Sequence, residues 1–296
     1  MDRIDGKRVV ITGATSGIGR ATAKALAKLG ANLVLVSRNK TIGTALARQL
    51  EKLNSNTSAG FVEADLSSFD QVRNAANQIR ERWSSIDILI NNAGARFDVY
   101  AKTPDNCERT LATNHLGHFL LTSLLLDQLT AAPAAKIITV SSSAATQAVN
   151  DGHWQYGPHD YDRKQAYAKS KLANLLFAFE LAHRLADTAI TSLAVDPGVV
   201  ATHFARNNGL VPWLKHLLYH ARRGELVRPA QGADTVIFLA TSTLPEPATG
   251  GYFRQRQEIR ACRAAYDVDA AAKLWEMSAS LTGFDPLPTK SPQTHM

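Results

Sequence analysis

The chain has 296 residues, of which 45% are hydrophobic and 20% charged, the balance of an ordinary soluble globular protein. It has no run of about 18 uncharged apolar residues and enters a strand pattern at once, so we expect neither a transmembrane segment nor a signal peptide. The net charge of +7 comes from scattered lysines and arginines, which argues against nucleic acid as a partner. Two cysteines without metal-ligand spacing predict no metal site and a reducing, cytoplasmic setting.

Apolar runs of strand length alternate with helical patterns along the chain. We expect strands at 8–13, 32–38, 59–66, 86–94, 135–142 and 190–198, and helices at 17–30, 40–54 and 67–83. The strands are continuous Val/Ile/Leu runs, which is typical of a parallel sheet covered by helices on both faces. The pattern predicts one α/β domain over residues 1–283, a Rossmann-type doubly wound parallel sheet, with a flexible tail at 284–296. Ligands of such sheets bind at the carboxyl ends of the strands.

A glycine-rich stretch, "TGATSGIG" at residues 12–19, joins the first strand to the first helix. Gly13 allows a sharp turn, and Gly17 and Gly19 allow the backbone to approach a pyrophosphate at the helix N-terminus. Ser16 and Ile18 complete the predicted dinucleotide loop. The spacing G-x-x-x-G-x-G alone also fits a plain tight turn, and its place directly after a buried strand favours the binding role.

The second strand ends in "LVLVSRN", with Arg38 where an acid would hold an adenosine 2′-hydroxyl. A guanidinium fork suits a 2′-phosphate, so the sequence favours NADP(H) over NAD. The alternative is a solvated arginine at a strand end.

The stretch "YAKSK" places Tyr167 and Lys171 four residues apart, on one face if the segment is helical. Taken alone, this spacing is an ordinary feature of helices. Only together with the other motifs does this spacing indicate a functional pair.

Together with "DLSS" at 65–68, "NNAG" at 91–94, "TNHLGHFLLT" at 113–122, "VSS" at 140–142 and "DPGVVAT" at 196–202, these motifs resemble the short-chain dehydrogenase/reductases. Within that family the chain looks most like the retinol dehydrogenase and WW-domain-oxidoreductase group. The resemblance implies cofactor contacts along the adenosine and the nicotinamide. These would be Asp65, Leu66, Asn92, Ala93, Gly94, Pro197, Gly198, Val200 and Thr202, besides Tyr167 and Lys171.

The resemblance also implies a catalytic set. Tyr167 would be general acid in reduction and general base in oxidation, and Ser142 would bind the substrate oxygen. Lys171 would hold the nicotinamide ribose and lower the pKa of Tyr167, and Asn114 would hold a water that relays protons. Lowering a tyrosine pKa from about 10 to about 7 needs about 4 kcal/mol, which we expect from the Lys171 ammonium and the oxidised nicotinamide.

These features predict an NADP(H)-dependent oxidoreductase that acts on a small-molecule carbonyl or alcohol. An NAD-preferring dehydrogenase and a non-catalytic dinucleotide-binding sensor or scaffold are the alternatives. His115 and His118, three residues apart without a third ligand, are expected to pack rather than bind zinc. His153 and Trp154 lie in the long insert between Ser142 and Tyr167, where they could reach a substrate or form a surface loop.

Two further segments carry hypotheses. The stretch "LANLLFAFELAHRL" at 172–185 is expected to be mainly core and a candidate homo-oligomer contact. Residues 209–229 place Trp213 and Leu217 on an apolar stripe, which fits a core helix, a membrane-surface helix or a lid. We favour a lid over an apolar substrate, within a substrate loop at about 200–229.

Overall fold

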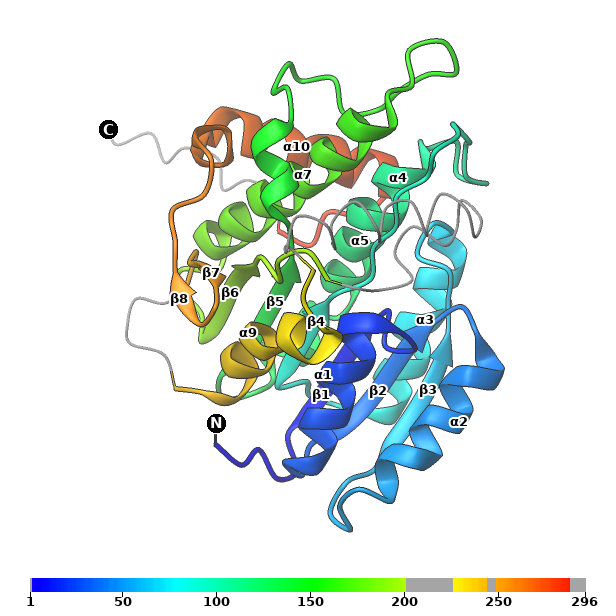
Figure 1. The fold of residues 1–296 in the computed structure, drawn as a ribbon, viewed down its shortest axis with the longest axis vertical. Helices are drawn as coiled ribbons and strands as arrows, with labels where there is room; N and C mark the ends of the chain where they lie inside the picture. The colour runs from blue at the N-terminus through cyan, green and yellow to red at the C-terminus, as the bar shows by residue number, and fades with distance from the viewer. Residues whose placement is uncertain (1, 201–225, 244–248, 288–296) are drawn as a thin grey trace, which may run out of the picture.

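The computed structural model describes residues 2–200, 226–243 and 249–287. Within them, eight strands form one sheet in the order β3-β2-β1-β4-β5-β6-β7-β8 (Figure 1). The strands are β1 Arg8–Thr12, β2 Asn32–Ser37, β3 Ala59–Glu63, β4 Ile88–Asn91, β5 Ala135–Val140, β6 Ile190–Val195, β7 Tyr252–Arg254 and β8 Gln257–Glu258. Neighbouring strands are parallel except for the β7–β8 pair. The predicted single-domain, doubly wound α/β fold is confirmed.

Helices cover both faces of the sheet (Figure 1). They are α1 Gly17–Lys28, α2 Lys40–Glu51, α3 Phe69–Arg82, α4 Arg109–Leu111, α5 Gly117–Leu124, α6 Leu126–Thr130, α7 Arg163–Arg184, α9 Pro229–Thr241 and α10 Val268–Thr282, with a π-helical turn η1 Ala112–Leu116 and 3₁₀ turns η2 Ser143–Gln147 and η4 Arg263–Tyr266. Side chains of α1, α2 and α9 share one hydrophobic cluster, and those of α3, α5, α7 and α10 share the other. Val9 and Val10 on β1 belong to different clusters, because successive strand residues point to opposite faces. Both faces are therefore apolar, which explains the continuous hydrophobic runs.

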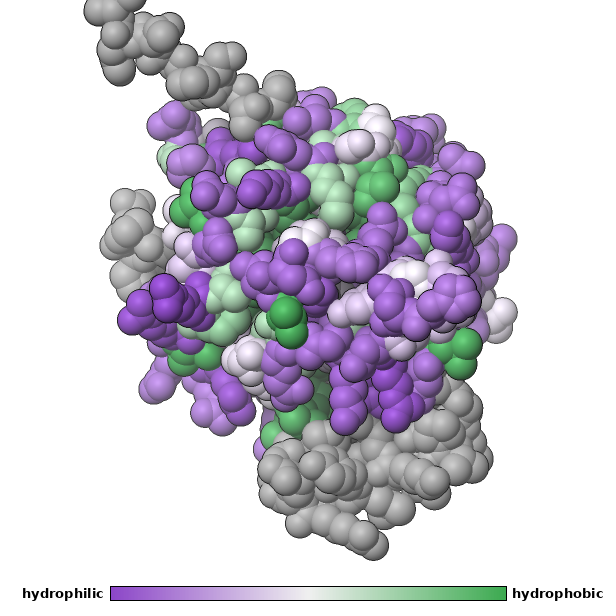
Figure 2. Space-filling view, turned by 90° about the horizontal axis from the view of Figure 1, so that it is seen from above, coloured by the Kyte–Doolittle hydropathy of each residue, from purple (hydrophilic) through white to green (hydrophobic). Residues whose placement is uncertain are grey.

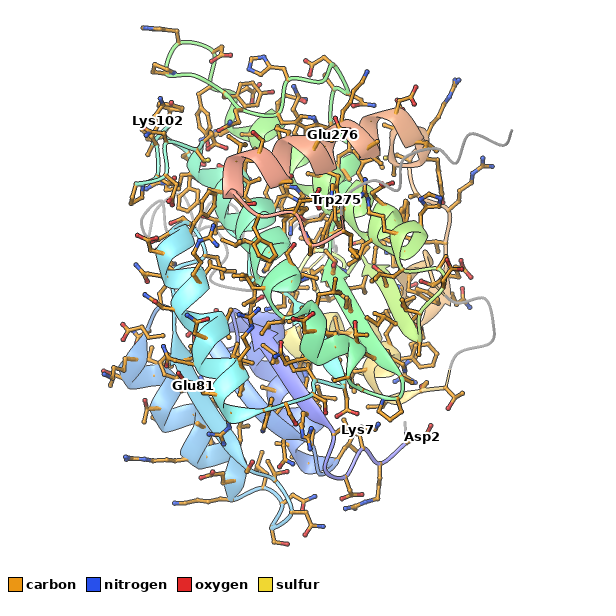
Figure 3. The ribbon with its side chains drawn as sticks, turned by 180° about the vertical axis from the view of Figure 1, so that it is seen from behind. Asp2, Lys7, Glu81, Lys102, Trp275 and Glu276 are labelled. Carbon is orange, nitrogen blue, oxygen red and sulfur yellow. The ribbon has the colours of Figure 1, made fainter. Side chains whose placement is uncertain are left out.

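The second cluster includes an aromatic group that joins three helices. The Trp275 ring lies 5.0 Å from Phe119 and 6.0 Å from Phe177, measured between centroids. Trp275 lies on the inner side of α10 and the exposed Glu276 on its outer side (Figure 3). Most apolar residues of 172–185 are buried in this same cluster, which confirms their mainly core role.

The carboxyl end of the chain adds elements that the sequence did not predict. β7 and β8 form a hairpin whose two central residues, Gln255 and Arg256, have positive φ angles of 51° and 63°. The Arg256 backbone N–H donates to Thr235 Oγ1, and its guanidinium pairs with Asp234 at 2.6 Å. Both partners lie on α9, so the hairpin is fixed to that helix.

Several predictions fall on residues outside the described ranges: Thr202, Trp213, Leu217, most of the substrate loop and residues 288–296 of the tail. Residues 284–287 are described, and there Asp285 accepts a hydrogen bond from Trp275 Nε1 at 3.1 Å. No helix within the described ranges combines the length and apolarity that a bilayer crossing requires. Hydrophilic side chains cover most of the face seen from above, with smaller hydrophobic groups between them (Figure 2).

Candidate active site

The chain changes winding direction between β1 and β4, so the loops that follow these two adjacent strands lie together. The Thr12 hydroxyl accepts hydrogen bonds from the backbone N–H groups of Asn92 at 2.9 Å and Ala93 at 3.0 Å. The Asn92 amide nitrogen donates back to the Thr12 carbonyl at 2.8 Å. The glycine loop and the "NNAG" segment, 80 residues apart, are thus brought together at the predicted place.

The glycines of this loop are required by conformation and by packing. Gly13 has a φ of +67°, and a Cβ there would lie 2.8 Å from the Ala93 Cα. A Cβ on Gly19 would lie 2.5 Å from the Asn92 amide nitrogen. Ser16 is exposed at the N-cap of α1, and its side chain makes no capping hydrogen bond within the described chain. The first N–H groups of α1 therefore face an open loop that suits a phosphate.

The predicted adenosine end of the site pairs two of the candidate residues. Arg38 Nη1 lies 3.8 Å from Asp65 Oδ2, and the two side chains are 56% and 32% exposed. Asp65 Oδ1 also accepts the Ser67 backbone N–H at 2.9 Å. Leu66 is buried against Gly117, where a Cβ would lie 2.8 Å from the Leu66 Cβ. Arg38 and Asp65 therefore form one edge, at which a guanidinium and a carboxylate both face solvent.

Tyr167 and Lys171 lie on α7, as their spacing predicts. Asp162 caps this helix by accepting the Lys164 N–H at 2.7 Å. The Lys171 ammonium lies 5.9 Å from the centroid of the Tyr167 ring and donates to the Val140 carbonyl at 3.0 Å. It also lies against Gly94, whose added Cβ would be 3.3 Å from it.

Ser142 follows β5 and completes the group, because its side chain lies close enough to Tyr167 to lower the pKa of the phenol. The adjacent Ser141 hydroxyl donates to the Lys171 carbonyl at 2.7 Å, which fixes α7 against the end of β5. The three side chains that the resemblance groups together are therefore neighbours at the carboxyl edge of the sheet.

The pKa of Tyr167 in the protein alone is set mainly by removal from water. Burial raises the pKa of the Tyr167 hydroxyl, and the hydrogen bond to Ser142 lowers it by less. Asp196 raises this pKa further and Arg96 lowers it. Burial also lowers the pKa of Lys171 to about 8. In the protein alone, removal from water dominates and leaves the phenol protonated; the expected lowering also depends on the oxidised nicotinamide and stays a prediction.

Asn114 lies in the π-helical turn η1, fully buried. Its amide oxygen accepts the Ala95 N–H at 2.8 Å, and its amide nitrogen donates to the Ala95 carbonyl and to Ser170 Oγ, both at 2.9 Å. The side chain thus joins the loop after β4 to α7, next to the catalytic candidates.

His118 links this turn to the glycine loop. Its Nδ1 lies 3.0 Å from the Asn114 carbonyl and its Nε2 lies 2.9 Å from Thr12 Oγ1. A carbonyl only accepts, so Nδ1 carries the proton and Nε2 accepts from the Thr12 hydroxyl. Burial lowers the pKa of both His118 and His115 to about 3, so both are neutral.

No cluster of metal-ligating side chains occurs among the described residues. The sequence expectation of packing histidines agrees with the burial of His115 and His118, but the hydrogen bond between His118 and Thr12 was missed. No local spacing indicates this bond, because Thr12 and His118 are 106 residues apart.

The segment after β6 holds the remaining cofactor candidates. Gly198, which follows Pro197, has a φ of +75°, and its N–H donates to Asp196 Oδ1 at 2.9 Å. A Cβ on Gly232 of α9 would overlap Val200 Cγ2 and lie 3.3 Å from Ile18 Cγ1. Val200 and Ile18 therefore meet at the start of α9.

The long insert before Tyr167 is anchored to the protein by Lys169. This buried ammonium donates to Asp151 Oδ1 and to the His153 carbonyl, both at 2.7 Å. Trp154 is buried in the hydrophobic cluster of α7 and α10, while the His153 side chain is exposed and stacks on Tyr156. Trp154 is therefore a core residue.

Comparisons with known proteins agree with this arrangement. The family model of the short chain dehydrogenases matches residues 7–210. Retinol dehydrogenase 12 of Mus musculus is 37% identical over 281 residues, which cover 95% of this chain and 88% of that protein. Among solved structures, an uncharacterised protein from Mycobacterium paratuberculosis has a TM-score of 0.77 at 32% identity, covering 98% of this chain and 97% of that one.

A third relative was solved with ligands. L-sorbose reductase from Gluconobacter frateurii, in complex with NADPH and L-sorbose, has a TM-score of 0.66 at 25% identity and covers 86% of this chain and 96% of that one. Since the family model spans most of the chain and the identity to retinol dehydrogenase 12 extends over nearly all of it, this protein is an oxidoreductase of CH–OH and C=O groups that belongs to the short-chain dehydrogenase family and is similar to its retinol dehydrogenases.

Proposed function

We propose that the protein is an NADP(H)-dependent oxidoreductase that uses Ser142, Tyr167, Lys171 and Asn114 to interconvert a carbonyl and an alcohol. The observation that carries this proposal is the grouping of Ser142 and Lys171 around Tyr167: Ser142 is close enough to lower the pKa of the phenol, and the Lys171 ammonium lies 5.9 Å from its ring. The Ser142 and Tyr167 hydroxyls can both turn to a substrate oxygen, since each can donate and accept.

The dinucleotide has a site that fits it. The open N-terminus of α1, with Gly13 and Gly17 at positive φ, suits the pyrophosphate, and Gly94 borders Lys171 where a ribose would be held. Bound there, the nicotinamide supplies or takes up the hydride.

Side chains of this protein transfer the proton and stabilise the charges that result. Burial keeps Tyr167 protonated, so in reduction its hydroxyl donates a proton to the substrate oxygen as negative charge develops there. Ser142 donates a second hydrogen bond to that oxygen and stabilises it. Lys171, with a pKa of about 8, is charged at neutral pH and stabilises the resulting tyrosinate. Asn114 positions the loop at Ala95 and the start of α7, and we propose that its carbonyl helps to hold the relaying water.

The preference for NADP(H) over NAD rests on Arg38. No carboxylate follows β2 directly, and the guanidinium is 56% exposed at the edge of the site. Its pairing with Asp65 is long enough, at 3.8 Å, for a phosphate to compete. The NADPH in the L-sorbose reductase structure supports the same preference.

Four sequence predictions stay part of this proposal: an apolar substrate, a lid built from residues 209–229, a cytoplasmic location and a homo-oligomer. The function itself is tested by the consumption of NADPH in the presence of a panel of aldehydes and ketones, with Tyr167→Phe as the comparison. Turnover by the parent chain and its loss in the variant are expected. Binding of NADPH without turnover of any carbonyl would favour a sensor or scaffold.

A further inference from the structure

A pocket of about 140 Å³ lies beside Ser142, on the side of the β7–β8 hairpin. Its inner wall is made by Leu175 and Tyr252, which are 1% and 5% exposed. Ser142 and Thr146 also line the pocket, so it adjoins the residue that is proposed to bind the substrate oxygen. A substituent of a carbonyl compound held by Ser142 can therefore enter this pocket.

The charges around the pocket do not cancel. Asp196 is buried, and its carboxylate lies 3.6 Å from Arg254 Nη1, so the charges of these two residues offset each other. Arg260 also lines the pocket, and it makes no ion pair with any carboxylate of the described residues. Its guanidinium lies 6.0 Å from the Tyr266 ring. The exposed Arg260 therefore adds one unpaired positive charge to the residues that line the pocket.

The hairpin holds these groups in place at a conformational cost. Gln255 and Arg256 both adopt left-handed conformations, which are unfavourable for non-glycine residues. The turn persists because Arg256 is fixed to Asp234 on α9. Arg254, the residue before this turn, is thereby kept beside Asp196 at the pocket.

We propose that this pocket, called the Ser142 pocket from here on, binds a carboxylate that an otherwise apolar substrate carries a few carbon atoms from its reacting carbonyl. The inference rests on the proposed function, since it assigns the substrate class of the same site. The volume leaves room for a short chain that ends in a carboxylate. Arg260 supplies the unmatched positive charge, and a carboxylate is a natural partner of a guanidinium.

The two cysteines provide a reporter for this pocket. Cys262 lines it and is partly exposed, whereas Cys107 is fully buried. Burial raises the pKa of the Cys107 thiol to about 11, so it forms little of the reactive thiolate. Labelling by N-ethylmaleimide should therefore occur at Cys262 and slow down when the pocket is filled.

The test compares levulinate, a keto acid, with its uncharged methyl ester. With NADPH as reductant, kcat/KM should be about ten-fold or more higher for levulinate, the size expected for a hydrogen bond to a charged group. Arg260→Met should bring the two values close together, while Arg263→Met, which removes an exposed arginine outside the pocket lining, should leave the ratio unchanged. Levulinate should slow the labelling of Cys262 in the parent chain and in Arg263→Met, and have no effect on it in Arg260→Met.

Equal kcat/KM values for acid and ester in the parent chain, or a ratio that survives Arg260→Met, would overturn the assignment of the pocket. Protection of Cys262 by levulinate without reduction of either compound would support the pocket and overturn the proposed activity. Reduction of the ester, with no higher kcat/KM for levulinate and no protection of Cys262 by levulinate, would support the proposed activity and overturn the pocket. Thermal unfolding of both arginine variants shows whether each keeps the fold.

Discussion

The two buried histidines make the stability of this protein sensitive to mild acid. In the folded state burial lowers the pKa of His115 and His118 to about 3, whereas an unfolded histidine titrates at about 6.5. Both states are neutral above that unfolded value, so no stability is lost there. As the pH falls below about 6.5 the unfolded state takes up protons that the folded state excludes, and the free energy of unfolding decreases.

The size of the effect follows from these two values. Between pH of about 7 and pH of about 5, each histidine should remove about 2 kcal/mol, and the pair about 4 kcal/mol, from the free energy of unfolding. This is a large part of the total stability of an ordinary domain. Lys171, with a folded pKa of about 8, is protonated in both states over this range and adds no slope. Burial raises the pKa of Glu108, which opposes the loss at the acidic end.

The assay is urea unfolding at a series of pH values for the parent chain and for His115→Phe and His118→Asn. Each variant lowers stability at neutral pH but should reduce the further loss at pH of about 5 by about 2 kcal/mol. His183→Gln is the matched control, because the His183 side chain is already exposed to water in the folded chain. If the acid-induced loss is the same in the parent chain and both variants, the buried histidines are not its cause.

Three other substitutions follow from the site. Tyr167→Phe should lower kcat by several orders of magnitude while NADPH still binds, which steady-state kinetics and a fluorescence titration would measure. Arg38→Asp should shift the ratio of NADPH to NADH affinity by roughly ten- to a hundred-fold toward NADH, and an unchanged ratio would mean that Arg38 is only solvated. Gly19→Ala should weaken NADPH binding and lower the melting temperature together, because its Cβ would lie 2.5 Å from the Asn92 amide nitrogen; an unaffected melting temperature would contradict this contact.

The strands β1 to β6 could be predicted from the sequence for one physical reason. β1 to β6 carry runs of apolar residues that fill both layers of the core, so local pattern and global burial agree. β7 and β8 have only three and two residues, too few to show a pattern, and they form because β6 offers an edge to pair with. The strands predicted at 59–66 and 86–94 extend past the observed ends of β3 and β4 into "ADL" and "NAG". The polar and small residues of these two stretches leave the sheet to form the site.

The site was predictable where a motif is local and not where it depends on distant residues. The spacing of Tyr167 and Lys171 places both on one face of α7, but it does not show that Lys171 is buried and Tyr167 partly buried, which shifts the pKa of each. The hydrogen bond from Thr12 to His118 joins residues 106 positions apart. The pairing of Asp196 with Arg254 likewise depends on a hairpin that no sequence pattern indicated.

Hydride transfer itself is the most direct test of the proposed reaction. NADPH that carries deuterium on the transferring face of the nicotinamide is incubated with the protein and a ketone, and the alcohol product is examined by mass spectrometry. The proposed reaction predicts that the alcohol carries one deuterium atom, and that the parent chain forms it while Tyr167→Phe does not do so detectably. Alcohol without deuterium, labelled alcohol formed equally fast by Tyr167→Phe, or no alcohol from any ketone or aldehyde would contradict it.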